Sequence, residues 1–339
     1  MKTCVLLVNL GTPDSPKTGD VRTYLGEFLN DPRVIDINAV GRTVLVNGII
    51  VPFRSPKSSK IYKELWDHWN GESPLLTYGL ELKDKLQEKF KNENITVEFA
   101  MRYRKPSLEM VLEKIKSENY EQIIIMPLFP QYASATTGSV MERVMKIISK
   151  WWVIPELKFI NNYFDHPKFI EAFVKRGEAY NWKDYDHVVF SYHGLPERQI
   201  EKVHPNLTCS DCNCPEQFNA AEKLCYRNQC YQTSRLIAEK LGIPKEKYTV
   251  AFQSRLGKNP WLSPYADQLV EQSAQKGMKK LLFFSPAFVA DCLETTIEIG
   301  DEYQELFEEK GGEKVQLVPS LNAEEEWISA CEAIIRERI

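Results

Sequence analysis

The chain has 339 residues and a formal net charge of -4 at pH 7, with charged residues making up 27% of the sequence. This length allows two domains or one large α/β unit, and an acidic balance without a long basic run excludes nucleic acid as a general partner. No apolar stretch is long enough for a membrane span or a secretory signal, so we expect a cytosolic protein. Its eight cysteines are then expected to be thiols or metal ligands rather than disulfides.

Short apolar runs separated by helical patterns recur along the whole chain. Runs of this kind, without alternating polar residues, are typical of strands that are buried on both faces of a parallel sheet. The expected strands are residues 4–10, 96–101, 122–126, 188–191, 248–253, 280–284 and 315–318. The predicted fold class is therefore α/β.

Three segments of the first half match three segments of the second half in the same order. "LLVNLGTP" matches "VFSYHGLP", "VEFAMRYRKP" matches "VAFQSRLGKNP", and "IIIMPLFPQYASATTG" matches "LLFFSPAFVADCLETT". This repeat predicts two similar Rossmann-like domains with parallel sheets, residues 1–165 and 166–339. Because ligands bind at the carboxyl ends of strands in such folds, we expect a cleft between the domains to form the binding site.

The run "VLVNGIIVPFRSPKSSK" is apolar and ends with the cations Arg54, Lys57 and Lys60. One interpretation is a loop and helix that pack on the core. The other is a hydrophobic lip with cationic anchors, which would suit a flat carboxylate-bearing ligand or a membrane surface. The sequence alone leaves both open.

His193 follows the predicted strand "HVVFSY" and precedes Gly194 and Pro196, so it lies in a turn at the end of a strand. A hydrogen-bonded turn histidine is the usual interpretation. Its place at a strand end also makes it a candidate metal ligand or general base. The other four histidines lie in polar stretches, where we expect exposed or structural side chains.

Five cysteines lie within one polar segment, "CSDCNCPEQFNAAEKLCYRNQC". They are Cys209, Cys212, Cys214, Cys225 and Cys230. Exposed free thiols oxidise readily, so a metal site is favoured over a cluster of free cysteines. Four thiolates satisfy either a zinc ion or a [2Fe–2S] cluster, and the spacing lacks the paired CxxC units of a two-knuckle zinc site. The other cysteines, Cys4, Cys292 and Cys331, are expected to be buried small residues.

The segment "FVADCLETTIEIGDEY" carries an acidic ridge. If it is an α-helix, steps of three, four and four residues place four carboxylates on one face. They are Asp291, Glu294, Glu298 and Glu302. A solvated helix face is the common interpretation of such a run. However, Asp291 and Glu294 follow the apolar "SPAFVA", and partly buried carboxylates need a cation or a proton to neutralise them. We therefore expect a path for a divalent cation.

Several motifs together resemble the ferrochelatase family, and they span nearly the whole chain in the family's order. They are "LLVNLGTPDSP", "MRYRKP", "PLFPQYASATTGS", "SYHGLPER", "FQSRLGKNPWLSPY" and "FVADCLETTIEI". The resemblance is closer to the protoporphyrin-using type than to the coproporphyrin-using type. It implies a lyase that inserts Fe²⁺ into protoporphyrin IX, forming protohaem and releasing two protons, as the last step of haem biosynthesis.

The resemblance also implies roles for individual residues. His193 matches the catalytic histidine and Glu294 its partner carboxylate, so both are expected to contact the substrate iron. The remaining ridge carboxylates match the metal path. The residues expected to bind porphyrin are Arg102, Tyr103, Phe288 and, on the lip of residues 45–60, Arg54. This lip implies peripheral association with the inner face of a membrane.

Some ferrochelatases carry a [2Fe–2S] cluster, so the resemblance favours such a cluster, held by four of the five clustered cysteines, with zinc as the alternative. Cys292 stands where many relatives have histidine, which argues against a metal role at that position. Two rival functions remain open at this point. They are a chelatase that acts on sirohydrochlorin and a non-catalytic haem or iron–sulfur sensor.

Overall fold

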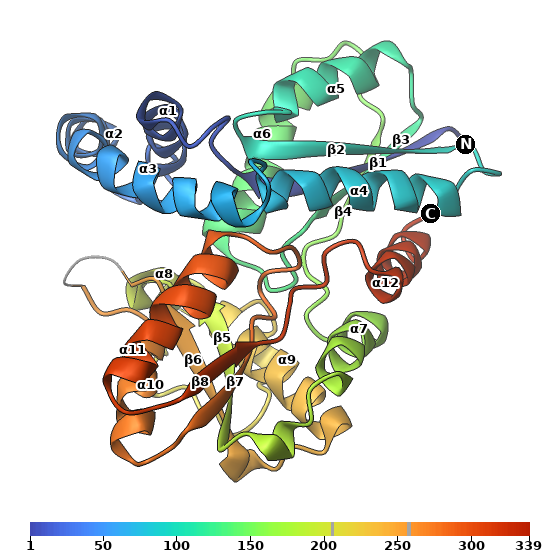
Figure 1. Ribbon diagram of the computed structural model, residues 1–339. Helices are drawn as coiled ribbons and strands as arrows, with labels where there is room; N and C mark the ends of the chain where they lie inside the picture. Colours follow the sequence, from blue (N-terminus) through green and yellow to red (C-terminus); the bar gives the residue numbers. More distant parts are fainter. Residues whose placement is uncertain (205–206, 256–258) are drawn as a thin grey trace. The chain divides into compact units, whose positions relative to one another are not determined.

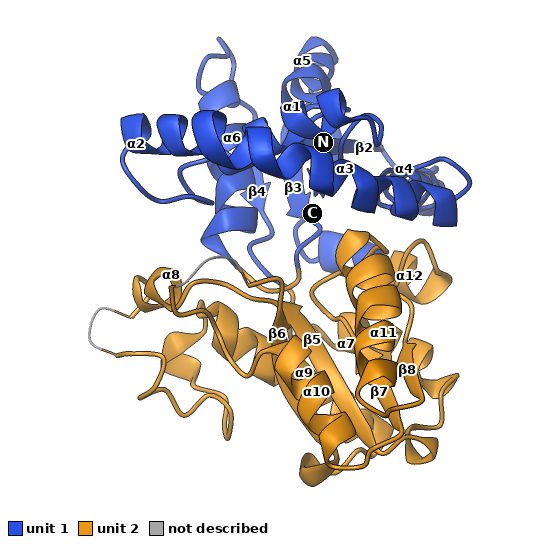
Figure 2. Ribbon diagram, turned by 60° about the vertical axis from the view of Figure 1, so that its left-hand side comes forward, with its two compact units in different colours: residues 1–129, 133–162, 331–339 blue, residues 130–132, 163–330 orange. Residues whose placement is uncertain are grey.

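The computed structural model describes residues 1–204, 207–255 and 259–339 (Figure 1). Contacts between residues group the chain into two compact units (Figure 2). Unit 1 comprises residues 1–129, 133–162 and 331–339, and unit 2 comprises residues 130–132 and 163–330. The division of the chain into domains 1–165 and 166–339 stays a prediction.

Unit 1 contains a parallel sheet of four strands in the order β2-β1-β3-β4. The strands are β1 (Thr3–Gly11), β2 (Ile95–Tyr103), β3 (Gln122–Pro127) and β4 (Glu156–Phe159). β1 and β3 are buried almost throughout, as expected for central strands covered on both faces. The sequence pattern missed β4, because this short edge strand is only partly buried and so lacks an apolar run.

Helices cover both faces of the unit 1 sheet, as Figure 1 shows for α4 on one side and α5 and α6 on the other. The close approach of α4 depends on Gly79, since a Cβ atom there would lie 2.3 Å from the ring of Phe99 on β2. The helices are α1 (Thr18–Leu29), α2 (Ala39–Thr43), α3 (Val51–His68), α4 (Pro74–Lys89), α5 (Leu108–Ser117) and α6 (Ser139–Ile148).

The predicted lip is helical: a π-helical turn, Val44–Ile50, joins α2 to α3. Val46 and Val51 are buried, which agrees with the interpretation of a segment that packs on the core. Phe53 is 81% exposed, however, and Val44 and Ile49 are also exposed. The segment therefore has one buried and one exposed apolar side.

Unit 2 repeats the architecture of unit 1, with a parallel sheet in the order β6-β5-β7-β8. Its strands are β5 (His187–His193), β6 (Tyr248–Gln253), β7 (Lys280–Phe284) and β8 (Lys314–Leu317). In both units the first strand in the chain lies between the second and the third. This shared order confirms the predicted α/β class with two Rossmann-like sheets.

The helices of unit 2 also lie on both faces of its sheet. α10, α11 and the preceding π-helical segment share a core with one face, and α7 packs closely on the other, where Gly177 approaches the ring of Phe284. The helices are α7 (Pro167–Glu178), α8 (Glu197–Glu201), α9 (Tyr226–Leu241), α10 (Ala266–Gln275) and α11 (Tyr303–Glu309). The last helix, α12 (Glu325–Arg336), begins in unit 2, and its residues from Cys331 onward belong to unit 1. Among the described residues, no helix is both long and apolar enough to cross a membrane.

The acidic ridge differs from the α-helix expected from its spacing. Glu294–Glu302 forms a π-helix that continues directly into α11, and the N–H group of Tyr303 bonds to the carbonyl oxygen of Glu298 five residues earlier. Asp291 lies before these helical turns. Its carboxylate accepts a hydrogen bond from the Thr295 hydroxyl, which also accepts one from the Cys292 N–H group. The four carboxylates therefore do not form one α-helical row.

Candidate active site

His193 is the last residue of β5, and the turn after it is fixed by close packing. Gly194 donates its N–H group to the carbonyl oxygen of Gln253 at 2.8 Å. A Cβ atom at Gly194 would lie 2.9 Å from that oxygen and 3.3 Å from the ring of Trp261, so a side chain at this position would force the turn to shift. The motif "HG" thus places the imidazole at the carboxyl end of the sheet, as predicted.

The His193 side chain is half-buried, and its Nδ1 atom lies 2.7 Å from the carbonyl oxygen of Gly194. A carbonyl oxygen can only accept a hydrogen bond, so in the neutral form of the imidazole the proton lies on Nδ1. The Nε2 atom then keeps its lone pair. In this tautomer His193 can accept a proton or bind a metal ion through Nε2.

Tyr226 supports His193 from the start of α9. Its hydroxyl donates a hydrogen bond of 2.9 Å to the carbonyl oxygen of His193. Tyr226 is buried, and its hydroxyl also hydrogen-bonds to the thiol of Cys230 one turn later. Burial, first, and the neighbouring Cys230 raise the pKa of Tyr226, so the hydroxyl remains a donor. No motif in the sequence indicates this contact.

Gln253 connects the strand end that bears His193 to the acidic π-helix. It is the residue of β6 in register with His193, and it is only 2% exposed. Its Nε2 atom donates to the carbonyl oxygen of Glu294 at 3.0 Å and to Oε2 of Glu298 at 3.1 Å. Ser191 on β5 donates to its Oε1 atom. The Gln253 amide thus joins the end of the unit 2 sheet to the acidic π-helix. The sequence analysis did not identify Gln253 as a site residue.

The Glu298 carboxylate is held by donors from three residues. Besides Gln253, it accepts hydrogen bonds from the N–H group of Ser254 at 3.0 Å, from the Ser254 hydroxyl, and from the Tyr303 hydroxyl at 3.0 Å. Burial and the Glu298 charge raise the pKa of Tyr303, which therefore stays protonated. Glu298 is a fixed charge rather than a freely moving side chain.

The other ridge carboxylates differ in exposure. Asp291 is buried and accepts bonds from the Asn322 amide at 2.8 Å and the Ser320 N–H group at 3.2 Å. Glu294 is half-buried, and burial together with the Glu294 charge raises the pKa of the Cys292 thiol. Glu302 is exposed. The four carboxylates therefore extend from the surface into the interior of unit 2.

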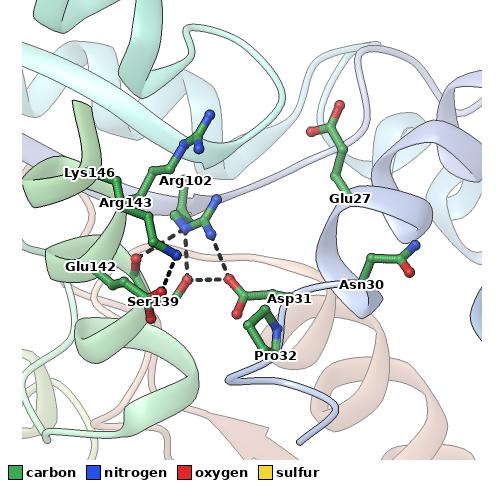
Figure 3. Close-up of a pocket in the computed structure, with 9 residues that line it drawn as sticks. All are labelled: Glu27, Asn30, Asp31, Pro32, Arg102, Ser139, Glu142, Arg143 and Lys146. Atoms are coloured by element: carbon green, nitrogen blue, oxygen red, sulfur yellow. Dashed lines mark hydrogen bonds and ion pairs between the residues drawn. The ribbon is translucent and has the colours of Figure 1, made fainter. Parts of the chain in front are cut away.

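Two of the predicted porphyrin-binding residues belong to a buried polar network in unit 1. Arg102 donates to Asp31 at 2.6 Å and to the Ser139 hydroxyl at 2.7 Å, and the Tyr103 hydroxyl donates to the same Asp31 oxygen at 2.9 Å. Figure 3 shows Arg102, Asp31 and Ser139 converging on one side of a cavity of about 250 Å³. Asp31 and Ser139 were not predicted. Contact of Arg102 or Tyr103 with a porphyrin stays a prediction.

The remaining predicted ligand-binding residues lie in two separate places. Phe288 is half-buried in the turn after β7, where its N–H group bonds to Ser285. Arg54 is exposed on α3, next to the exposed Phe53. Residues 256–258, which lie within the quoted motif "FQSRLGKNPWLSPY", are outside the described residues.

The five clustered cysteines are all buried, with exposed fractions between 0% and 8%. Burial raises the pKa of the Cys209 thiol to about 12. Nearby carboxylates and Cys225 add to this rise, and the Arg227 charge opposes it. Burial also raises the pKa of Cys225 to about 11, with Cys212 among the contributing charges. These mutual effects indicate that thiols from both ends of the segment lie near one another.

A buried hydrogen bond joins His204, which precedes this segment in the chain, to Glu222 within it. His204 is 5% exposed, and its Nδ1 atom lies 2.6 Å from the carboxylate of Glu222. His204 is therefore not exposed, and of the two expected alternatives its side chain is the structural one. Within the ranges that the structure describes, no group of three or more His, Cys, Asp or Glu residues is arranged to hold a metal ion.

Comparison with known proteins identifies the family. The ferrochelatase family model matches residues 2–339. The chain belongs to the ferrochelatase family. It is 43% identical over 339 residues to a ferrochelatase of Legionella pneumophila strain Paris, with 100% of both chains covered. It is 42% identical over 328 residues to a ferrochelatase of Coxiella burnetii strain Dugway 5J108-111, covering 96% of this chain and 91% of the relative. The protein is thus an enzyme of haem biosynthesis that inserts iron into a porphyrin, as the motifs predicted.

Solved structures with the same fold are much more distant in sequence. SirB from Bacillus subtilis with Fe³⁺ matches with a TM-score of 0.52 and 12% identity, covering 99% of this chain and 95% of that chain. The sirohydrochlorin chelatase SirB from Bacillus subtilis subspecies spizizenii, in complex with cobalt, matches with a TM-score of 0.54 and 11% identity over the same shares. These likenesses confirm the chelatase-type fold of the ferrochelatase family and leave the choice of tetrapyrrole to other observations.

Proposed function

We propose that the enzyme uses protoporphyrin IX and Fe²⁺ and forms protohaem, with His193 as the base that accepts a proton from the ring. The observation that carries this proposal is the hydrogen bond between His193 Nδ1 and the Gly194 carbonyl, which leaves Nε2 as the acceptor. Two pyrrole N–H protons must leave as the ferrous ion binds the four ring nitrogens, so the reaction needs a proton acceptor close to the ring. The iron changes neither charge nor oxidation state.

Glu294 is the proposed partner of His193, and Asp291, Glu298 and Glu302 form the proposed path for the ion or for released protons. Their exposure supports this order, since Glu302 is exposed, Glu294 and Glu298 are half-buried and Asp291 is buried. Carboxylate oxygens attract a divalent cation, and burial strengthens that attraction. The four donors on Glu298 keep its charge in one place without neutralising it.

Phe288, Tyr103, Arg102 and Arg54 are the proposed contacts for the macrocycle and its propionates. A planar porphyrin cannot receive the ion until the ring bends, so binding energy at its periphery must be used to distort it. Arg54 supports this assignment by its exposed cation beside the apolar Phe53, which suits a propionate attached to an apolar ring. Arg102 is already paired with Asp31, and this pair fixes the orientation of its guanidinium.

Residues 45–60 are also the proposed site of peripheral contact with the inner face of a membrane. The exposed Ile49 and Phe53 together with Arg54, Lys57 and Lys60 combine an apolar surface with cations, which suits a membrane with anionic lipids. Sedimentation with anionic vesicles tests this. Phe53→Ser should weaken binding, whereas Trp152→Ser should not, although Trp152 is 99% exposed elsewhere in unit 1. Equal losses in both variants would contradict the role of the lip.

A [2Fe–2S] cluster is the proposed resident cofactor, because the five thiols of the segment suffice for its four thiolate ligands, although the described residues form no group of three or more arranged to hold a metal ion. Cys230 differs from the other clustered cysteines, because it is fully buried within α9 and its thiol bonds to the Tyr226 hydroxyl. The proposed ligands are therefore Cys209, Cys212, Cys214 and Cys225. Such a cluster supplies a one-electron redox centre. Zinc is the alternative, and it is colourless.

The identity of the tetrapyrrole is tested by anaerobic assays with Fe²⁺ and three substrates: protoporphyrin IX, coproporphyrin and sirohydrochlorin. Loss of substrate fluorescence and the absorbance of the product follow the reaction. The proposal requires the highest kcat/KM with protoporphyrin IX. Faster insertion into coproporphyrin or sirohydrochlorin would contradict the proposed substrate while leaving the family assignment intact.

A further inference from the structure

Asn322 binds the segment that leads into the acidic π-helix. It lies between β8 and α12 in unit 2 and is only 6% exposed. Its Oδ1 atom accepts a hydrogen bond of 2.9 Å from the N–H group of Asp291, and its Nδ2 atom donates one of 2.8 Å to the Asp291 carboxylate. Its own N–H group donates to the carbonyl oxygen of Val289 at 2.8 Å. One residue thus makes three hydrogen bonds to residues 289–291.

These contacts and the backbone together select the residue type at position 322. An N–H group only donates and a carboxylate only accepts, so the partner of Asp291 needs an acceptor and a donor on one short side chain. Asn322 also has a φ angle of +51°, a left-handed conformation that asparagine tolerates better than most residues. Aspartate would set a second carboxylate against Asp291, and glycine would satisfy only the backbone.

A chain of buried hydrogen bonds leads from Asn322 to the side chain of Glu294. The Asp291 carboxylate accepts a bond of 3.2 Å from the Thr295 hydroxyl, which itself accepts one of 2.9 Å from the N–H group of Cys292. The Cys292 thiol hydrogen-bonds to the Glu294 carboxylate. Asp291, Cys292 and Thr295 are at most 6% exposed, so water does not compete for these bonds. The orientation of the Glu294 carboxylate therefore depends on this network.

We propose that Asn322 is a positioning residue for the reaction: through Asp291 it fixes the first turn of the acidic π-helix and, with it, the Glu294 carboxylate. This inference rests on the proposed role of Glu294 as the partner of His193. A misplacement of about 1 Å can lower the rate of an enzyme about 100-fold even when the substituted residue lies away from the chemistry. Asn322 can therefore control kcat without touching the substrate.

Ser320 provides a matched control in the same loop. Its N–H group donates to the Asp291 carboxylate at 3.2 Å, but its buried hydroxyl makes no hydrogen bond within the described part of the chain. Ser320→Ala therefore removes a buried side-chain oxygen and keeps the contact to Asp291. Asn322→Gly, in contrast, removes the amide and still allows the positive φ angle.

The first test measures kcat, KM for Fe²⁺ and KM for protoporphyrin IX in anaerobic assays of the wild type and these two variants. Asn322→Gly should lower kcat at least about tenfold and leave KM for protoporphyrin IX within about twofold of wild type. Ser320→Ala should keep all three constants within about twofold of wild type, because every bond to Asp291 remains.

A double-mutant cycle tests the pair itself. Asn322→Asp alone sets two carboxylates against each other and should lower kcat about as much as Asn322→Gly. When Asp291→Asn is combined with Asn322→Asp, one amide again faces one carboxylate. The kcat of this double variant should be at least about fivefold above that of Asn322→Asp. Recovery of the folded fraction without recovery of kcat would overturn the positioning role.

The outcomes distinguish this inference from the proposed function. Wild-type kcat in folded Asn322→Gly would overturn the role of Asn322 and leave the proposed function in place. Equal decreases in Asn322→Gly and Ser320→Ala would also overturn it, because any change in the loop would then suffice. Wild-type kcat in Glu294→Gln would overturn the proposed role of Glu294 and this inference with it. If Asn322→Gly does not fold, as judged by circular dichroism, Asn322→Asp and the double variant decide the matter by the recovery of kcat.

Discussion

The hydroxyl of Tyr226 and the carbonyl oxygen of His193 are joined by a hydrogen bond of 2.9 Å between α9 and the end of β5. Tyr226 directly follows Cys225, which caps α9. The first turn of one helix therefore contacts the strand end that bears the catalytic candidate and also carries a cysteine of the proposed cluster. A shift of Cys225 would therefore move the adjacent Tyr226, which is hydrogen-bonded to His193.

Removal of this hydroxyl in Tyr226→Phe should lower kcat and leave KM for porphyrin nearly unchanged. A typical hydrogen bond contributes about 0.5–1.5 kcal/mol, so we expect a decrease in kcat of about two- to tenfold. Tyr192→Phe is the control, since it removes a buried hydroxyl that bonds to Ser234 instead. Steady-state kinetics measure kcat and KM in both variants. Visible absorbance shows whether each variant keeps the proposed cluster. A kcat equal to that of wild type would show that this contact does not position His193.

Gln253→Ala should lower the free energy of unfolding and raise the apparent KM for Fe²⁺. The substitution leaves the buried Ser191 hydroxyl without its acceptor and removes one of the four donors to Glu298, and an unsatisfied buried group costs about 1–3 kcal/mol. Chemical unfolding measures the free energy, and initial rates at varied Fe²⁺ measure the apparent KM for metal. Ser191→Ala is the control, because it removes only the contact to Oε1. Unchanged stability in Gln253→Ala would contradict the proposed link between β6 and the π-helix.

Glu298→Gln and Glu302→Gln should each raise the apparent KM for Fe²⁺ while the KM for porphyrin stays constant. Both substitutions keep the shape of the side chain and remove a negative charge from the proposed path. Glu305→Gln removes an exposed carboxylate from α11, just beyond the proposed path, and is the matched control. If all three variants show the same metal dependence as wild type, the path does not pass through these residues.

Asp186 should stabilise unit 2 in a pH-dependent way. Hydrogen bonds from the N–H groups of Lys279 and Lys280 at the start of β7 lower its pKa from the ordinary value of 3.8. A lowered folded-state pKa stabilises the protein above the unfolded-state pKa, and this contribution is lost as pH falls through the folded-state pKa. The melting temperature of Asp186→Asn should therefore be below that of wild type at pH 7, with the difference shrinking towards pH 3. A difference independent of pH would contradict this assignment.

The strand pattern and the internal repeat predicted the fold because buried parallel strands leave a direct trace in sequence. Both sheets, the position of His193 and the burial of Cys4, Cys292 and Cys331 followed from such local signals. The edge strand β4 was missed because it is only partly buried. The π-helix was missed because a spacing of four residues is equally compatible with an α-helix.

The supporting residues of the site could not be predicted because their partners lie far apart in the chain. Tyr226 and His193 are separated by 33 positions, and Gln253 and Glu298 by 45. The partners Asp31 and Arg102 are separated by 71. Only the folded topology brings these pairs together, and a single tyrosine, glutamine or aspartate carries no motif that distinguishes it from other buried polar residues.

The most direct test of the role of His193 compares His193→Ala with His187→Ala at the two ends of β5. His187 bonds to Thr249 and lies at the opposite end of the strand, so its replacement controls for damage to the sheet. We predict that His193→Ala binds protoporphyrin IX within about twofold of wild type but loses at least about 100-fold in the rate of Fe²⁺ insertion, the lower range for a general base. His187→Ala should retain most of its activity. Substantial turnover by folded His193→Ala protein would contradict the central role of this histidine.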